Sequence, residues 1–294
     1  MRIHLCGVRG STPAPGPDFL RYGGHTSCVA LAHDGAAGPV LILDAGTGLR
    51  RVTPLLAGHA FAGTILLTHL HWDHVHGLPF FQAGDRDDAR ATLLLPQQPG
   101  GTAADVLGRG MSPPHFPITP NGLRGDWTFG MLEPGQLKAE GFTVEAREVP
   151  HKGGRTFGYR VSDGRSVITY IPDHCPTAAG PGPEGWGEYH PAALDLAAGS
   201  DLLIHDAFLL PGEVAAEASF GHAAADYAVG LGEHAGARRV MLAHHKPGRT
   251  DAELDHLAAR LAAGGAGQPG SPGQPGRPGR PDVIVAAEGE ILEL

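Results

Sequence analysis

The sequence predicts an α+β fold in which two mixed β-sheets pack face to face and helices cover both outer sides, an αββα sandwich. The main observation is that short apolar segments alternate with helical segments in each half of the chain. Two β-rich halves with helices of this kind are typical of two sheets covered by helices. The chain of 294 residues, with 41% hydrophobic residues, is also large enough for a substantial core. We therefore expect residues 1–294 to form a single domain.

The first half is predicted to supply five strands, each a short apolar run bounded by turn residues: 2–6, 27–33, 40–44, 64–68 and 92–95. Helices are expected over 48–58 and 102–109. The second half begins with a strand meander, 142–149, 156–161 and 166–171. Helices 191–199, 222–235 and 251–263 then alternate with strands 201–206 and 239–243.

Two segments interrupt this pattern. Residues 111–135 are rich in Pro and Gly and are predicted to be a long irregular insertion, which acts as a lid or a dimer contact. In residues 264–281, Gly recurs at every third position from Gly267 to Gly279. Five such triplets are too few for a collagen helix, so we expect an extended, mobile connector. Strands 282–287 and 290–294 are expected to follow it as a closing hairpin.

Composition excludes several classes of protein. The formal charge of −9 argues against a broad electrostatic surface for nucleic acid. The three cysteines, Cys6, Cys28 and Cys175, are too few and too scattered for a disulfide framework. The chain starts with a strand pattern rather than a signal peptide, and no apolar run approaches the roughly 18 residues of a membrane span. We therefore expect a cytoplasmic protein with no membrane partner.

The most informative stretch is residues 68–74, Thr-His-Leu-His-Trp-Asp-His. It places four possible metal ligands, His69, His71, Asp73 and His74, directly after the apolar run 65–67. In an extended segment, the first three lie on one side and His74 begins the following turn. Neutral imidazoles and a carboxylate are ligands that zinc and similar cations accept. Two metals can share such a cluster, so the string predicts a hydrolytic metal site.

A two-metal site needs about three or four protein ligands for each ion. Three further apolar strands finish in His or Asp: the first before His151, the second before Asp173 and the third before His244. One such ending is expected by chance. Four in one chain indicate that these strand ends build a common site.

At this point the chain resembles the metallo-β-lactamase-fold hydrolases. The resemblance is carried over 40–245 by Asp-Ala-Gly-Thr-Gly from Asp44, the His-rich string, His151 ahead of Phe-Gly-Tyr at 157–159, Asp173 and His244. Further segments are similar to the phosphodiesterase branch of that superfamily, which includes ribonuclease Z and cyclic-phosphate phosphodiesterases: 10–13, 22–28, 205–207 and 221–223.

The resemblance implies a role for each position. The first metal would be held by His69, His71 and His151, and the second by Asp73, His74 and His244. Asp173 would bridge both metals, and His222 would donate a proton to the leaving oxygen. Asp73, Asp173 and His222 would thus be the catalytic residues. Asp44 would orient a ligand histidine, and His205 and Asp206 would do the same or position His222. Two alternatives stay open: His245 in place of His244, and Cys175 in place of Asp173.

The implied cofactors are two divalent ions, Zn2+ first and Mn2+ or Fe2+ as alternatives, about 3.5–4 Å apart with a water between them as nucleophile. We predict a phosphodiesterase that acts on a small or cyclic nucleotide-like substrate, and the resemblance implies a homodimer. The nearest alternative is a tRNA 3′-end endonuclease, for which RNA would be the partner. Hydrolysis of lactones, thioesters or lactams is a third possibility. A metal-binding sensor without turnover is disfavoured by the near-complete ligand set.

Overall fold

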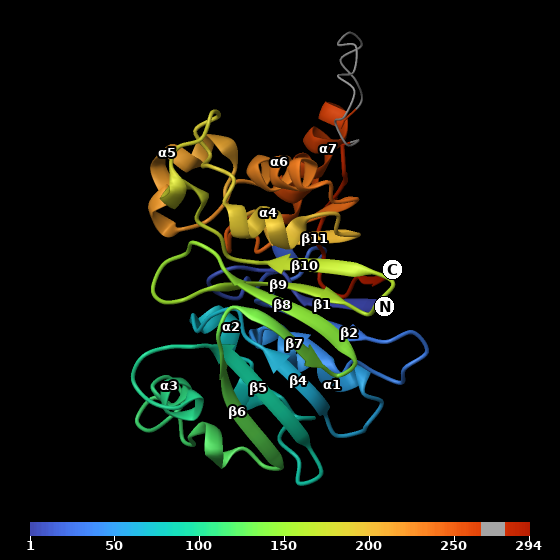
Figure 1. The fold of residues 1–294 in the computed structure, drawn as a ribbon, viewed down its shortest axis with the longest axis vertical. Coiled ribbons are helices and arrows are strands. Elements are labelled where there is room, and N and C mark those ends of the chain that lie inside the picture. Colours follow the sequence, from blue (N-terminus) through green and yellow to red (C-terminus); the bar gives the residue numbers. More distant parts are fainter. Residues whose placement is uncertain (266–279) are drawn as a thin grey trace.

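The structure is a computed structural model that describes residues 1–265 and 280–294. Most of the predicted connector, residues 266–279, lies outside the described residues. The described chain forms two seven-stranded mixed sheets that lie face to face between two layers of helices (Figure 1). The predicted αββα sandwich is therefore confirmed. None of the described helices is both long enough and apolar enough to cross a membrane.

The first sheet is antiparallel at one end and parallel at the other. Its strands, in spatial order, are β14 (Ile291–Glu293), β1 (Arg2–Gly7), β2 (Cys28–Ala32), β3 (Leu41–Leu43), β4 (Ala62–Leu66), β5 (Arg90–Pro96) and β6 (Asp126–Leu132). The pairs from β14 to β3 are antiparallel, and those from β3 to β6 are parallel.

The second sheet has the same arrangement. Its strands, in spatial order, are β13 (Asp282–Val285), β12 (Arg239–Ala243), β11 (Leu202–Asp206), β10 (Val167–Ile171), β9 (Phe157–Ser162), β8 (Phe142–Glu148) and β7 (Gly135–Ala139). The pairs from β7 to β10 are antiparallel, and those from β10 to β13 are parallel.

Three apolar layers hold the fold together. The central layer lies between the sheets and includes Leu5, Phe142 and Met241, all at most 1% exposed. The second layer joins the outer face of the second sheet to α4 (Pro191–Ala197), α5 (Val214–Glu217), α6 (Ala225–Ala235) and α7 (Asp251–Gly265). The third joins the outer face of the first sheet to α1 (Val52–Leu55) and α3 (Ala103–Gly108). The short helix α2 (Trp72–Val75) follows β4.

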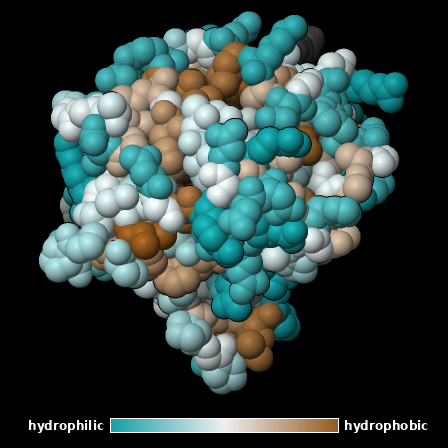
Figure 2. Space-filling model, turned by 90° about the horizontal axis from the view of Figure 1, so that it is seen from below, coloured by the Kyte–Doolittle hydropathy of each residue, from teal (hydrophilic) through white to brown (hydrophobic). Residues whose placement is uncertain are grey.

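The surface seen in Figure 2 shows no single large apolar patch. Hydrophobic residues appear there as separate groups between hydrophilic ones. Isolated surface apolar groups of this kind are normal for a folded chain.

Three predictions from local sequence patterns were wrong. Segment 111–135 is not irregular throughout, because β6 occupies its second half and pairs in parallel with β5, with Phe129 opposite Leu93. Residues 282–294 do not form a hairpin: β13 pairs with β12 and β14 pairs with β1, so the two strands belong to different sheets. The predicted helix 48–58 is a 3-10 turn followed by the single-turn helix α1. It ends early because Ala57 and Gly58 adopt left-handed backbone angles (φ 48° and 87°).

Candidate metal centre

The predicted ligands come together at one edge of the sandwich because each of them follows the carboxyl end of a strand. The His69–His74 string follows β4 in the first sheet. In the second sheet, His151 follows β8, Asp173 follows β10 and His244 follows β12. These three strands run in the same direction, since β8 and β10 are both antiparallel to β9 and the pairs from β10 to β12 are parallel. Their ends therefore face the end of β4 across the space between the sheets.

The first ligand group consists of His69, His71, His151 and Asp173. Each offers one ligand atom, and these atoms lie within 4.8 Å of one another. His151 Nε2 is 3.3 Å from His71 Nδ1 and 3.4 Å from Asp173 Oδ1. His69 Nε2 is 3.9 Å from the same carboxylate oxygen. The residues predicted to hold the first metal thus surround one point.

The second ligand group consists of Asp73, His74 and His244, whose ligand atoms also lie within 4.8 Å of one another. His74 Nε2 is 3.3 Å from Asp73 Oδ2 and 2.9 Å from Asp173 Oδ2. His244 Nε2 is 3.6 Å from Asp73 Oδ2 and 3.4 Å from Asp173 Oδ1. The Asp173 carboxylate therefore contacts both groups, as a bridging ligand would.

The two alternatives left open by the sequence point away from the cluster. His245 Nε2 is 2.8 Å from the carbonyl oxygen of Ala286, and the burial of the ring lowers the pKa of His245 to about 3. Cys175 Sγ is 3.6 Å from the hydroxyl of Thr177. Neither residue belongs to a ligand group among the described residues. The structure thus brings His244 and Asp173 to the cluster.

Several buried polar atoms at the centre lack protein partners, and this indicates whether metal ions would fit there. The Nε2 atoms of His69, His74 and His244 and the Oδ2 atom of Asp173 are buried and have no hydrogen bond to any described residue. Leaving a buried polar atom unpaired costs about 1–3 kcal/mol. These four atoms all point into the cluster, so ions bound there would satisfy them.

The charge of the site leads to the same conclusion. Asp44, Asp73, Asp173 and Asp206 are between 0% and 6% exposed, and in the described chain their ion-pair partners are all histidines. Buried carboxylates require compensating positive charge. Two divalent cations carry the same charge as four carboxylates with the opposite sign. The residues present therefore fit two divalent ions.

Asp44 lies directly behind the second ligand group, where the resemblance placed a residue that orients a ligand. Its carboxylate is 2.8 Å from His74 Nδ1. It also accepts hydrogen bonds from the backbone and hydroxyl of Thr68 and, at 3.0 Å, from the hydroxyl of Tyr170. These donors fix the carboxylate, which in turn directs Nε2 of His74 toward the cluster.

Several supporting contacts had no role assigned from the sequence. Ser27 Oγ lies 3.1 Å from His244 Nδ1, and the Ser11 backbone N–H donates to Asp73 Oδ2 at 2.7 Å. The carbonyl oxygen of Gly221 lies 2.8 Å from His151 Nδ1. Each of these residues sits in a segment that resembles the phosphodiesterase branch, at 10–13, 22–28 and 221–223. That similarity was the only sequence signal for them.

His222 lies beside the cluster, in the loop before α6. Its Nδ1 is 3.0 Å from Asp206 Oδ2 and 3.7 Å from Asp173 Oδ1. Burial alone would lower the pKa of His222, but the nearby carboxylates of Asp206, Asp173 and Asp73 raise it to about 9. One ring nitrogen of His222 also falls within 4.8 Å of ligand atoms of Asp173 and His244, so this residue could contribute to a metal site as well.

The two residues predicted to support His222 differ in what they contact. Asp206 bonds directly to His222, and it also accepts from the backbone N–H groups of His174, Phe208 and Ala223. His205 contacts neither His222 nor a residue of the two ligand groups. Its Nε2 lies 3.0 Å from His174 Nδ1, because alternate residues of β11 face opposite sides of the sheet. A role for His205 in orienting a ligand or His222 thus has no direct contact behind it in the described chain and stays a prediction.

The protonation of the ring nitrogens differs between the groups. Burial lowers the pKa of His69, His71 and His244, which favours the neutral form that binds metals. Burial would also lower the pKa of His74, but the carboxylates of Asp73, Asp173 and Asp44 raise it well above its usual range. The neighbouring histidines in turn hold the pKa of Asp173 well below its usual value, despite burial.

Comparison with known proteins agrees with this geometry. Residues 40–245 match a family model described as a beta-lactamase superfamily domain. A ribonuclease Z of Salinibacter ruber is 28% identical over 264 residues, which cover 75% of this chain and 79% of the relative. Among solved structures, the metallo-beta-lactamase fold protein YhfI of Bacillus subtilis has a TM-score of 0.69 at 16% identity and covers 99% of both chains.

A diphosphatase of the PhnP family has a TM-score of 0.66 at 15% identity, and the alignment covers 100% of this chain and 97% of that one. At such identities the two solved structures support the fold alone. The family model, however, spans most of the chain and includes the whole His-rich string, Asp173 and His244. The chain therefore belongs to the beta-lactamase superfamily and is a metal-dependent hydrolase of that superfamily.

Proposed function

We propose that the protein is a dinuclear phosphodiesterase that cleaves a small or cyclic nucleotide-like phosphodiester. The observation that carries this proposal is the position of the Asp173 carboxylate. One oxygen lies within 3.4–3.9 Å of His69, His151 and His244, and the other lies 2.9 Å from His74. A single carboxylate thus joins two ligand groups that would each hold one ion. We propose zinc for both ions, with manganese or iron as alternatives.

Two bound divalent ions would supply an activated water and would neutralise the charge that develops on the phosphoryl oxygens. The protein's own part is to hold their ligands rigidly and to handle protons. His222 is the proposed proton donor because its ring lies beside the cluster, 3.7 Å from Asp173 Oδ1, and because the carboxylates around it raise its pKa to about 9 in the metal-free protein. Asp206, 3.0 Å from His222 Nδ1, stabilises the protonated ring and leaves Nε2 of the ring free to reach a leaving oxygen.

The proposal is tested with the metal-loaded protein and a chromogenic phosphodiester, bis(p-nitrophenyl) phosphate, beside p-nitrophenyl acetate. We expect the wild type to turn over the phosphodiester and to bind about two ions per chain. Asp173→Ala should lose both the turnover and the bound ions. Asp88→Ala is the matched control, since it removes a carboxylate that is 64% exposed and belongs to neither ligand group. Preference for the carboxylic ester, or full phosphodiester turnover in Asp173→Ala, would contradict the proposal.

RNA 3′-end processing is the second candidate, since the relative in Salinibacter ruber is named ribonuclease Z. A cavity of about 690 Å³ next to His69 and His71 is lined by Arg109, Lys152 and Arg155, and we call it the basic cavity. Arg109 and Lys152 could contact a nucleic-acid backbone, whereas Arg155 is paired with Glu133 and Glu148. Cleavage of a precursor tRNA faster than of a cyclic or dinucleotide phosphodiester, with an affinity that falls steeply with salt, would favour this candidate over the first.

A further inference from the structure

A second, larger cavity adjoins the metal centre, and neither ligand group lines it. It measures about 1140 Å³, and in the described chain its apolar lining includes Trp72, Leu78, Phe80, Met111 and Phe116. We call it the aromatic cavity. Small-molecule sites are typically apolar hollows of about 300–1,000 Å³ with a few polar groups that fix orientation. Here the polar groups include His25, Thr47, Arg50, His76 and Asp85.

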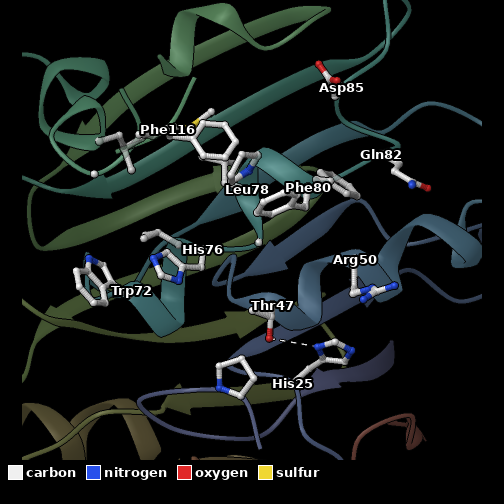
Figure 3. Close-up of a pocket in the computed structure, with 18 of the residues that line it drawn as sticks. His25, Thr47, Arg50, Trp72, His76, Leu78, Phe80, Gln82, Asp85 and Phe116 are labelled. Atoms are coloured by element: carbon white, nitrogen blue, oxygen red, sulfur yellow. Dashed lines mark hydrogen bonds between the residues drawn. The ribbon is translucent and has the colours of Figure 1, made fainter. Parts of the chain in front are cut away.

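Figure 3 shows how the side chains are placed. Trp72 and His76 lie on one side, and Leu78, Phe80 and Phe116 lie on the adjoining side. His25 and Thr47 lie across from Phe80 and Phe116, joined by a contact of 3.2 Å between His25 Nδ1 and Thr47 Oγ1. Planar rings thus flank an open space with polar groups on the far side.

Two of these rings are exposed in a way that packing does not explain. Trp72 is 70% exposed and Phe80 is 62% exposed. The indole of Trp72 is stacked on the ring of His76, with centroids 5.4 Å apart and planes 16° from parallel. Phe80 is held edge-on against Phe116, with centroids 5.8 Å apart. The rings are therefore fixed by their neighbours while most of their surface stays open, as in a preformed stacking site.

The aromatic cavity is tied to the metal centre at two points. Trp72 lies between His71 and Asp73 in the chain, so it joins a residue of the first ligand group to one of the second. Pro13, in the wall of the cavity, belongs to the loop whose Ser11 N–H bonds to Asp73. A substrate that lies against Trp72 is thus held next to the ligands of both groups.

The neighbouring basic cavity differs in charge, although it shares Trp72, Val75, Leu107 and Gly110 with the aromatic cavity, whose Arg50 and Asp85 carry opposite charges. It contains His69 and His71 and is lined by three cationic side chains. Anionic parts of a substrate would therefore be drawn to the basic cavity. A flat, weakly polar group is better accommodated on the other side of Trp72.

We infer that the aromatic cavity binds the nucleobase, or an equivalent planar aromatic group, of the phosphodiester substrate, with Trp72 as the main stacking partner. This inference rests on the proposed function and makes it more specific. It assigns Trp72 as a specificity-determining residue. A phosphodiester with only aliphatic groups would lack this contact and would bind less tightly.

The test compares two ligands that share a sugar phosphate but differ in the base. Affinities of AMP and ribose 5-phosphate for the metal-loaded protein are measured by titration calorimetry. We expect AMP to bind more tightly, and Trp72→Ala to weaken AMP about tenfold or more while leaving ribose 5-phosphate unchanged. Trp72→Phe should keep most of the preference. Leu20→Ala, which removes an apolar residue that is 76% exposed outside both cavities, is the control.

Because Trp72 adjoins two proposed ligands, metal content is measured for every variant. If Trp72→Ala loses ions, the comparison of AMP with ribose 5-phosphate is repeated with Phe80→Ala. Phe80 lines the same cavity but is not adjacent in sequence to a proposed ligand. Equal affinity of the wild type for the two ligands, or an unchanged preference in these variants, would overturn the inference. The two failures are distinguishable: absent phosphodiester turnover refutes the proposed function, whereas intact turnover without a base preference refutes the cavity assignment alone.

Discussion

The two ligand groups differ in how tightly the protein encloses them. Asp73, His74 and His244 of the second group are all at most 6% exposed. In the first group, His71 is half-buried and lines the basic cavity. One proposed metal position is therefore enclosed by protein, while the other opens toward the space from which a substrate would arrive.

The groups also differ in the contacts behind the ligands. In the second group, each residue has its own support: Asp44 for His74, Ser27 for His244 and the Ser11 N–H for Asp73. In the first group, His69 lies 3.1 Å from the hydroxyl of Thr68 and His151 lies 2.8 Å from the carbonyl oxygen of Gly221. In the described chain, however, the only hydrogen-bond partner of the His71 ring is His151, which is itself a proposed ligand. Ligands that are held from behind bind metals more tightly. Because the His71 ring lacks such support, we expect the second proposed position to hold its ion more tightly than the first.

Removal of one ligand from each group should have the largest effect on metal content. It tests directly whether the two positions hold their ions unequally. We expect His71→Ala to lose the first ion and to retain about one ion per chain, because the second group is intact without it. His244→Ala should lose most of both ions, since the Asp173 bridge then lacks its fixed partner. Metal content after extensive dialysis is the measurement. The asymmetry would be refuted if His244→Ala kept one ion and His71→Ala kept none.

The sequence predicted which residues would meet, because all of them follow apolar strands and strand ends share an edge of a sheet. Of the residues behind these ligands, it predicted Asp44 through the family resemblance but not Ser11, Ser27 or Gly221. Ser27 and His244 lie 217 positions apart, and no local pattern links a serine to a histidine at that separation. The hairpin prediction for 282–294 failed for the same reason. Local turn residues suggested that the two strands pair, but β14 finds its partner in β1 at the opposite end of the chain.

Trp72 illustrates a different limit of the sequence. It was visible inside the His-rich string, but a string does not show whether an aromatic residue is buried or exposed. The cavity that it lines is completed by Leu78, Phe80 and Phe116, which come from the following turn and from the loop after α3. The predicted insertion 111–135 thus contributes residues to a cavity wall through its first half, while its second half is an ordinary strand. A lid function for this segment stays a prediction.

Removal of the Asp44 carboxylate, which contacts His74, should have an intermediate effect on metal binding. We expect Asp44→Ala to weaken metal binding about 10- to 100-fold, because His74 loses the contact that orients it. The affinity of each ion is measured by competition with a chelator of known strength. The loss should fall on the more tightly held ion, since Asp44 contacts the second group alone.

Tyr170→Phe is the matched control for that variant. It removes one hydrogen bond to Asp44 but leaves the carboxylate and its contact with His74 in place. It should lower the free energy of unfolding by about 1 kcal/mol, the usual value of one buried hydrogen bond, with little change in metal affinity. Equal losses of affinity in Asp44→Ala and Tyr170→Phe would indicate that packing, rather than orientation of His74, controls binding.

The smallest expected effect is a difference in proton release between the two positions. The pKa of His74 is raised well above its usual range, so this ring is protonated at pH 7 in the metal-free protein. The pKa values of His69 and His71 are lowered, so these rings are already neutral. Binding of an ion to the second group should therefore release about one proton, and binding to the first group should release close to none.

The sign of the pH dependence follows from these directions. Because a proton on His74 competes with the metal, affinity at the second position should rise with pH until the raised pKa is passed, by up to about tenfold for each pH unit. Affinity at the first position should be nearly constant above neutral pH. Titration calorimetry in two buffers with different ionisation enthalpies separates the released protons from the binding heat. Equal proton release in both binding steps would show that the carboxylates around His74 do not distinguish the two positions.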